Sequence, residues 1–308
     1  TVTSGGNNID FGDVGGANQL TDDAGAGNLT FAGGDIANLT VTTAANVNFD
    51  EDFNTDGQIS VNSTAAITVA AGSNVTAEDT LEFSGGSVDI NGSVTGHSVE
   101  VTGTTTLAGT INGNDGDVTM NSSVDVDGDS NVSSDNGNVT FLDVVEGPST
   151  LTADAPTGTV TFTTTVGAAT ALSGLDVNAD VLELNADVTT AGTVDLTGTD
   201  TVTLGADLVI DTSAAAAADI LFDNNSTINE VAGADAQLTL TTLGDIRIND
   251  AVIDDLLISA GADAVSLSGT INTDVAIDMD GAASVVLSDS VTLISAGNVL
   301  TPGVDGAQ

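Results

Sequence analysis

Almost all of the side chains in this chain that could do chemistry are carboxylates. Its 308 residues include 45 acidic residues, one Arg and one His, and they include no Lys, Cys, Trp or Tyr. Carboxylate and amide oxygens are the ligands that Ca²⁺ prefers in proteins. Two stretches, residues 52–58 and 125–129, place such side chains at every second position. The sequence therefore predicts cation binding at these two places, with Ca²⁺ as the candidate ion.

The first stretch has the sequence DFNTDGQI over residues 52–59 and resembles the first half of an EF-hand or dockerin calcium loop. In such a loop, alternate oxygen-bearing side chains converge because a glycine at the sixth position permits a sharp turn. The resemblance implies that Asp52, Asn54 and Asp56 bind Ca²⁺ through their side chains and that Gln58 binds it through its backbone carbonyl.

The first stretch departs from the calcium-loop pattern at its far end. The twelfth position of the loop carries Glu or Asp in that family, whereas here it is Ser63. Asp50 and Glu51 are the nearest carboxylates that could replace the missing ligand. The alternative interpretation is an acidic turn between two strands, with no ion bound.

The second stretch is an acidic corner built around one glycine. Asp125, Asp127 and Asp129 flank Gly128, and Asn131 follows closely. The three carboxylates form a second candidate site for Ca²⁺. A solvated turn explains the same residues without an ion.

The net charge limits the kinds of partner that the protein can bind. At −44, the chain is expected to repel DNA, RNA and anionic membranes, and to attract divalent cations or basic partners. Salt screens the repulsion between its carboxylates and should therefore stabilise the fold. A surface adapted to seawater or brine explains the same composition and is compatible with cation binding.

Several kinds of site and segment are excluded or not indicated. The absence of Cys excludes disulfides, thiolate metal sites and a cysteine nucleophile. His97 has no partner His or Cys, and Arg247 is expected to face outward and contact a carboxylate on a neighbouring turn, so we predict no enzyme activity. No basic leader and no run of 18 apolar residues is visible, so we expect a mature form or a segment of a longer chain, without direct membrane insertion.

A repeat of about 20 residues organises the rest of the chain. Each repeat opens with two apolar residues separated by one outward residue, often Thr or Glu, which indicates a half-buried strand. The opening residues are Leu39, Ile59, Leu81, Val99, Val118, Val139, Val160, Leu182, Val202, Ile220, Leu238, Leu256 and Val275. Each is followed two positions later by a second apolar residue.

A second motif about eight residues into each repeat supplies the corners of the fold. Residues 90–94, INGSV, and 107–111, LAGTI, show it: apolar residues flank a Gly and small residues that permit a sharp bend. Short strands joined by such corners, repeated about 15 times, predict an all-β fold of the parallel β-helix (β-solenoid) type. We expect residues 1–308 to form one such solenoid, with irregular first turns over 1–38 and a proline-containing loop insertion over 142–158.

The repeat style itself has a likeness among known proteins. Segments such as 158–179 and 192–211, GTVDLTGTDTVTLGADLVID, resemble the bacterial β-strand-repeat surface proteins, related in style to filamentous haemagglutinins and autotransporter passengers. The resemblance covers nearly the whole chain but involves no site motif. It implies a right-handed β-helix at the cell surface or outside the cell, used as an adhesin, stalk or matrix fibre.

The partners follow from that architecture. Solenoid ends expose unpaired strand edges unless they are capped. We therefore expect contact with copies of the chain or with further repeats of it through those ends, and surface polysaccharide is a candidate ligand. Two other functions stay open: a β-helix that binds or cleaves polysaccharide with paired carboxylates, and an ice-binding face of Thr columns.

Overall fold

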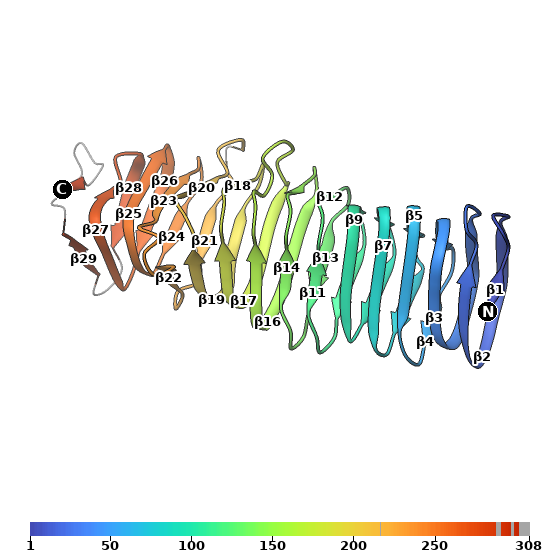
Figure 1. The fold of residues 1–308 in the computed structure, drawn as a ribbon. Helices are drawn as coiled ribbons and strands as arrows, with labels where there is room; N and C mark the ends of the chain where they lie inside the picture. Colours follow the sequence, from blue (N-terminus) through green and yellow to red (C-terminus); the bar gives the residue numbers. More distant parts are fainter. Residues whose placement is uncertain (216, 288–290, 297–298, 302–308) are drawn as a thin grey trace. The chain divides into compact units, whose positions relative to one another are not determined.

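The computed structural model describes residues 1–215, 217–287, 291–296 and 299–301 (Figure 1). These residues form strands and turns, and they include no helix that could cross a membrane. The strands pair in parallel, about 20 residues apart, in about 14 turns, which confirms the predicted β-solenoid. The chain divides into two compact units, unit 1 (Thr1–Asp143) and unit 2 (Val144–Gln308).

Unit 1 is a stack of short and long strands. Its strands are β1 (Val2–Thr3), β2 (Ile9–Asp23), β3 (Leu29–Phe49), β4 (Phe53–Thr55), β5 (Ile59–Val69), β6 (Asn74–Ala77), β7 (Thr80–Ile90), β8 (Ser93–Gly96), β9 (Ser98–Leu107), β10 (Thr110–Gly113), β11 (Val118–Met120), β12 (Val124–Val126), β13 (Ser130–Ser133) and β14 (Val139–Phe141).

Unit 2 is built in the same manner. Its strands are β15 (Val145–Glu146), β16 (Thr150–Phe162), β17 (Gly174–Leu184), β18 (Val188–Thr189), β19 (Val194–Leu204), β20 (Leu208–Asp211), β21 (Ile220–Phe222), β22 (Thr227–Glu230), β23 (Gln237–Thr241), β24 (Ile246–Ile248), β25 (Asp250–Ala260), β26 (Ala262–Leu267), β27 (Thr270–Asp278), β28 (Ala282–Leu287), β29 (Thr292–Ser295) and β30 (Val299–Thr301).

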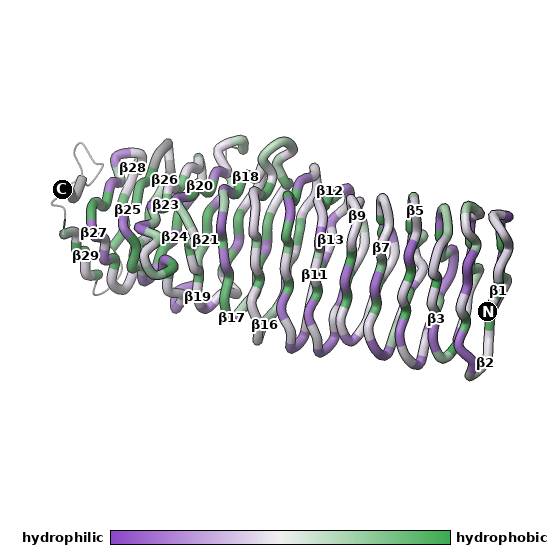
Figure 2. Tube along the Cα trace, in the orientation of Figure 1, coloured by the Kyte–Doolittle hydropathy of each residue, from purple (hydrophilic) through white to green (hydrophobic). Residues whose placement is uncertain are grey.

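The predicted opening residues of unit 1 lie directly on one another. The column in register runs through Leu39, Ile59, Leu81, Val99, Val118 and Val139. All of these side chains are buried, and the residue that follows each one faces outward. Figure 2 shows the result in unit 1 as an alternation of colour along the strands, with hydrophilic residues gathered at the turns on the lower edge. Period-two patterning therefore predicted both the strands and their vertical register here.

Phenylalanine rings pack against one another in the core of the first turns. The rings of Phe11, Phe31 and Phe49 follow one another with centroids 5.3 Å apart at each step. Phe53 packs against Phe31 at 4.8 Å, and Phe83 continues the series beyond Phe49 at 5.8 Å. Such ring pairs add about 0.5–1.5 kcal/mol each beyond the apolar area they bury.

Glycine is required at the predicted corners because the backbones of successive turns approach closely. A Cβ placed on Gly109 would overlap the carbonyl oxygen of Gly92, its counterpart one turn earlier. The same carbonyl accepts a 3.0 Å hydrogen bond from the amide of Thr110. The corner therefore stays within the hydrogen-bonded stack only if it has no side chain.

Many Asn and Asp side chains also hold one turn to the next. The Oδ1 atoms of Asn38 and Asp117 accept 2.9 and 2.8 Å hydrogen bonds from the amides of Gln58 and Asn138, one turn later. The same type of bond is made by Asn8, Asn46, Asp52, Asp187, Asp207, Asp219, Asp245 and Asp250. Some of the Asp residues therefore have a structural role, because their side chains accept hydrogen bonds from backbone amides that have no partner in the sheet ladder.

In unit 2 the predicted single column does not exist beyond Val202. Val202 pairs with Ile228, whereas Ile220 stacks on Val194. The cause is the alanine-rich turn between β20 and β21, which lengthens the coil to 26 residues and moves the next strand to another side of it.

The prediction that Val275 opens the last repeat as a core residue is also wrong. Val275 faces outward and is 45% exposed, whereas Ile277 is buried and stacks on Leu256. Val275 and Ile277 have the same parity, but the register of β27 against β25 shifts by one residue between Thr273 and Ala276, so Asp274 and Val275 are both exposed and the inward series resumes at Ile277.

Two predicted irregular regions are more regular than expected. Parallel pairing already includes Val2 and Thr3 of β1, and β2 pairs with β3 from Ile9 onward with register shifts after Gly16 and after Asp22. Residues 142–158, expected to be a loop insertion, instead form β15 and the first part of β16. Pro148 lies in the turn between them, and Pro156 lies where the register of β16 against β17 shifts, so both prolines avoid a ladder position.

Candidate functional site

Unit 1 contains an open cavity of about 540 Å³, which we call the acidic cavity. It lies on the outside of the first turns, and small residues form its floor. The five carboxylates around it are those of Asp13, Asp35, Asp50, Glu51 and Asp52. All five side chains are exposed, and no cationic side chain lines the cavity. It is therefore a place of strongly negative potential, to which cations are drawn.

The cavity exists because glycines replace side chains on the turn between its carboxylates. Gly33 is the register partner of Asp13, and Gly34 pairs with Phe53 on the following turn. A Cβ on Gly33 would lie 3.7 Å from the Oδ1 atom of Asp13 and 3.5 Å from the carbonyl oxygen of Asp52, so its absence leaves room between these residues. A Cβ on Gly34 would point the other way, into the Phe53 ring of the core at 2.6 Å.

The first predicted site lies partly on this cavity. Asp52 lines it, and its Oδ1 atom accepts 2.9 Å hydrogen bonds from both the amide and the side-chain nitrogen of Asn74. Asn54 faces outward from β4 and is the register partner of Asp35. Asp50 and Glu51, proposed as replacement ligands, also line the cavity.

The other predicted ligands of the first site point elsewhere along the strand. Residues 53–55 form the extended strand β4, so Asp52, Asn54 and Asp56 share one outward face at intervals of about 6.6 Å. A calcium loop would coil at this point. Gln58 is used at the next corner, where its amide donates to Asn38. Of the four predicted ligands only Asp52 lines the acidic cavity, and Asn54, Asp56 and Gln58 lie outside its lining.

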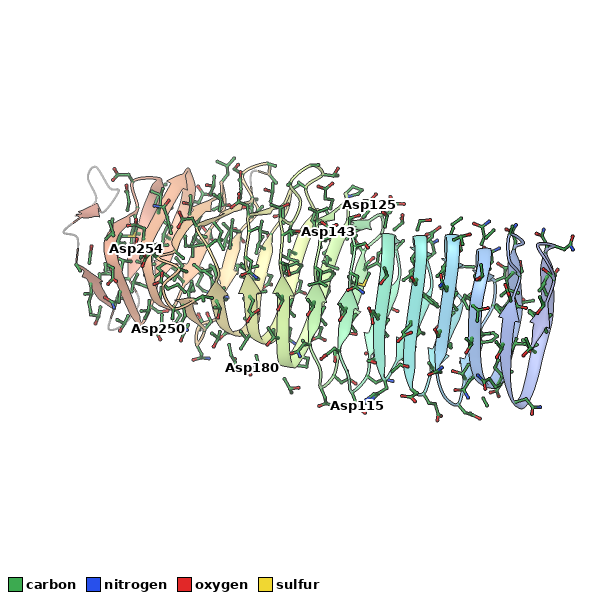
Figure 3. The ribbon with its side chains drawn as sticks, in the orientation of Figure 1. Asp115, Asp125, Asp143, Asp180, Asp250 and Asp254 are labelled. Carbon is green, nitrogen blue, oxygen red and sulfur yellow. The ribbon has the colours of Figure 1, made fainter. Side chains whose placement is uncertain are left out.

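The second predicted site is an outward-facing turn. Asp125, Asp127 and Asp129 are all exposed, and Asp125 belongs to β12. The amide of Asp127 donates to the carbonyl of Leu107 on the preceding turn at 2.9 Å. Figure 3 labels Asp125 at the edge of unit 1 opposite Asp115. The three carboxylates project into solvent around the corner.

Within the described residues, no three or more His, Cys, Asp or Glu side chains are arranged to hold a metal ion as they stand. Calcium binding at residues 52–58 and 125–129 stays a prediction.

Sequence reasoning missed one buried carboxylate. Asp22 in β2 is fully buried, and neither of its oxygens makes a hydrogen bond of acceptable geometry. Burial, and after it the neighbouring Asp23, raises the pKa of Asp22 above its usual value. The signal was available: Asp22 follows Leu20 by two residues, the spacing of an inward-facing pair.

Two carboxylates are stacked on each other in unit 2. Asp176 of β17 and Asp195 of β19 are direct register partners. Desolvation, and after it the charges of Asp195 and Asp154, raises the pKa of Asp176. The parallel register brings like charges together here because each turn contributes the same position of its strand.

No protein-family profile, no curated protein and no solved structure matches this chain significantly.

Proposed function

We propose that the chain is a structural segment of an extracellular or cell-surface protein, in which stacked β-solenoid turns form a stalk, fibre or adhesive matrix. The observation that supports this best is the continuous column of buried aliphatic residues in unit 1, from Leu39 to Val139, bound turn on turn by parallel ladders. Such a stack transmits load through every ladder and corner bond between its turns.

The outer surface suits exposure to solvent and salt. Most of the large apolar side chains are buried, and carboxylates, amides and hydroxyls make up much of the outer surface. The net charge of −44 keeps copies soluble and disfavours nucleic acid and anionic lipid as partners. Contacts with other copies or further repeats are proposed to involve turns at the ends of the stack, where strands lack a neighbour.

Calcium is proposed as a stabilising ion of this segment. The five carboxylates of the acidic cavity repel one another, and a divalent ion among them would relieve that repulsion. The ligands proposed first are Asp35 from one turn and Asp50 and Asp52 from the next turn of the stack. An ion bound there would link those turns.

Immunogold labelling tests the proposed location and role together. Antibodies raised against the purified chain are applied to intact cells of the source organism and, in parallel, to permeabilised cells. A surface segment labels intact cells, on projections or in the extracellular matrix. Labelling that requires permeabilisation would contradict the proposal, as would an even distribution through the cytoplasm.

A further inference from the structure

The single Arg of the chain occupies an outward position in unit 2. Arg247 lies in the middle of β24, between the buried residues Ile246 and Ile248. Its register partners are Leu221 on the preceding turn and Ser266 on the next. The nearest carboxylate in the same column, that of Asp195, belongs to the turn before Leu221.

The guanidinium of Arg247 is held in place without an ion pair. Its Nε donates a 2.9 Å hydrogen bond to the backbone carbonyl of Phe222. Across the described residues, none of the carboxylates forms a salt bridge with it, although the chain has 45 acidic residues. Within the part of the chain that the structure describes, no acceptor binds the Nη groups, and the bond from Nε to Phe222 restrains the guanidinium.

Arg247 also lines a small cleft of about 140 Å³. Its walls are formed by Asn224, Arg247, Ser266, Leu267, Ser268 and Val286. Ser266 supplies a hydroxyl and Asn224 an amide, and neither side chain makes a hydrogen bond within the described residues. The cleft thus combines unused polar donors with an apolar wall, as small-molecule sites do.

We propose that this cleft binds an organic monocarboxylate. A planar guanidinium binds a carboxylate through two parallel hydrogen bonds, and a hydroxyl and an amide can donate to the same oxygens. Val286 is 52% exposed and offers an apolar surface to the carbon chain of such a ligand.

The charge of the protein selects against more highly charged anions. Every negative charge on a ligand is repelled by the net charge of −44, so a phosphate dianion is repelled more strongly than a carboxylate. The volume of about 140 Å³ suits a carboxylate with a short carbon skeleton. Two sources share this chemistry: an acidic sugar residue and an acidic amino-acid side chain.

The single Arg makes the test direct. The full chain is labelled with [¹⁵N-guanidino]arginine, so the guanidinium spectrum contains the signals of Arg247 alone. Sodium propionate is titrated into it at constant ionic strength, with sodium chloride making up the balance. The expected result is a saturable shift of the Arg247 signals. A shift that grows linearly without saturation, or that chloride reproduces alone, would overturn the proposal.

A pair of variants at Leu221 provides the matched control, and both keep Arg247. Leu221→Glu places a carboxylate one turn from the guanidinium, about 4.8 Å along the stack, where it should occupy the donors. Propionate binding should weaken about tenfold or more, as expected for loss of a charge-assisted hydrogen bond. Leu221→Gln has the same size without the charge and should bind within about twofold of the parent.

The source of the carboxylate is decided by two further ligands in the same assay. Methyl glucuronide represents acidic sugars, and an N-acetylglutamate amide represents acidic side chains. Tighter binding of the first assigns the cleft to a single acidic sugar residue, and tighter binding of the second assigns it to a single acidic side chain, because a ligand with many negative charges would be repelled by the net charge of −44. Failure of all three carboxylates to saturate the Arg247 signals would exclude the site and would leave the proposed structural role untouched.

Discussion

Asp22 is stacked directly on Val41, in a column of unit 1 that is otherwise apolar and continues through Val61 and Phe83. Val2 is its partner on the other side. The Asp22 carboxylate is fully buried there and has no hydrogen-bond partner for either oxygen. An unsatisfied buried polar group destabilises a fold, so this position is a weak point of the first turns.

Replacing Asp22 by an apolar residue should stabilise the protein. Asp22→Val makes the column continuous and removes the desolvated carboxyl, so the free energy of unfolding should rise by about 1–3 kcal/mol near pH 7. Chemical denaturation followed by circular dichroism measures it. Asp10→Asn in the same strand removes an equal charge at an exposed position and should change stability far less.

The effect of Asp22 should also depend on pH. Because the pKa of Asp22 is raised in the folded state, the folded protein binds the proton more tightly than the unfolded chain. Stability from this group is therefore present at acidic pH and is lost as pH rises from the ordinary Asp value through the raised pKa. The difference in melting temperature between parent and Asp22→Val should shrink on acidification, and a constant difference from pH 7 to pH 4 would contradict the assignment.

The corner at Gly109 should not tolerate a side chain. Gly109→Ala drives a methyl group into the Gly92 carbonyl and should lower the free energy of unfolding by about 1–3 kcal/mol, the usual range for overpacking. Gly12→Ala is the control, because a Cβ there has no atom within 4 Å. Equal melting temperatures for the two variants would show that the turns are not packed as closely as described.

The acidic cavity should make stability depend on calcium. Adding CaCl₂ should raise the melting temperature more than MgCl₂ of equal ionic strength, and EDTA should reverse it, since an ion bound only by the folded state stabilises it by about 2.7 kcal/mol at 100 times its Kd. Combining Asp35→Asn with Asp50→Asn should remove most of this increase. Asp115→Asn, at an exposed carboxylate outside the cavity, should preserve it.

The fold could be predicted from the sequence where the repeat length is regular. The prediction of register failed where the length of a turn changes. Val118 and Val139 could be placed on one column because each begins a short apolar-polar-apolar run about one regular turn apart. Ile220 could not, because the alanine-rich turn before it adds residues that carry no periodic signal. Strand periodicity fixes which face a residue occupies but does not count the residues in a corner.

The candidate sites were less predictable because they depend on neighbours from other turns. Asp52 was found from its local spacing, but Asp13 and Asp35 join it only through register between turns. The outward direction of Arg247 followed from alternation, whereas its bond to the Phe222 carbonyl depends on how the preceding turn lies beneath it. Such information is absent from any single stretch of sequence.

Relieving the contact between Asp176 and Asp195 should stabilise unit 2 at neutral pH. The two residues are register partners, and like charges opposite one another in a sheet cost about 0.2–1 kcal/mol. Asp195→Asn should therefore raise the free energy of unfolding by about that amount and move the pKa of Asp176, measured by carboxyl ¹³C chemical shifts, toward its ordinary value.

The gain in stability should depend on pH. The repulsion between the two carboxylates is present above the raised pKa of Asp176 and fades as Asp176 is protonated, so the gain should disappear at acidic pH. Asp180→Asn, at an exposed position of the same strand outside this pair, should leave the Asp176 titration unchanged. If Asp195→Asn leaves that titration unchanged as well, the two carboxylates do not interact and the register of β17 against β19 is other than described.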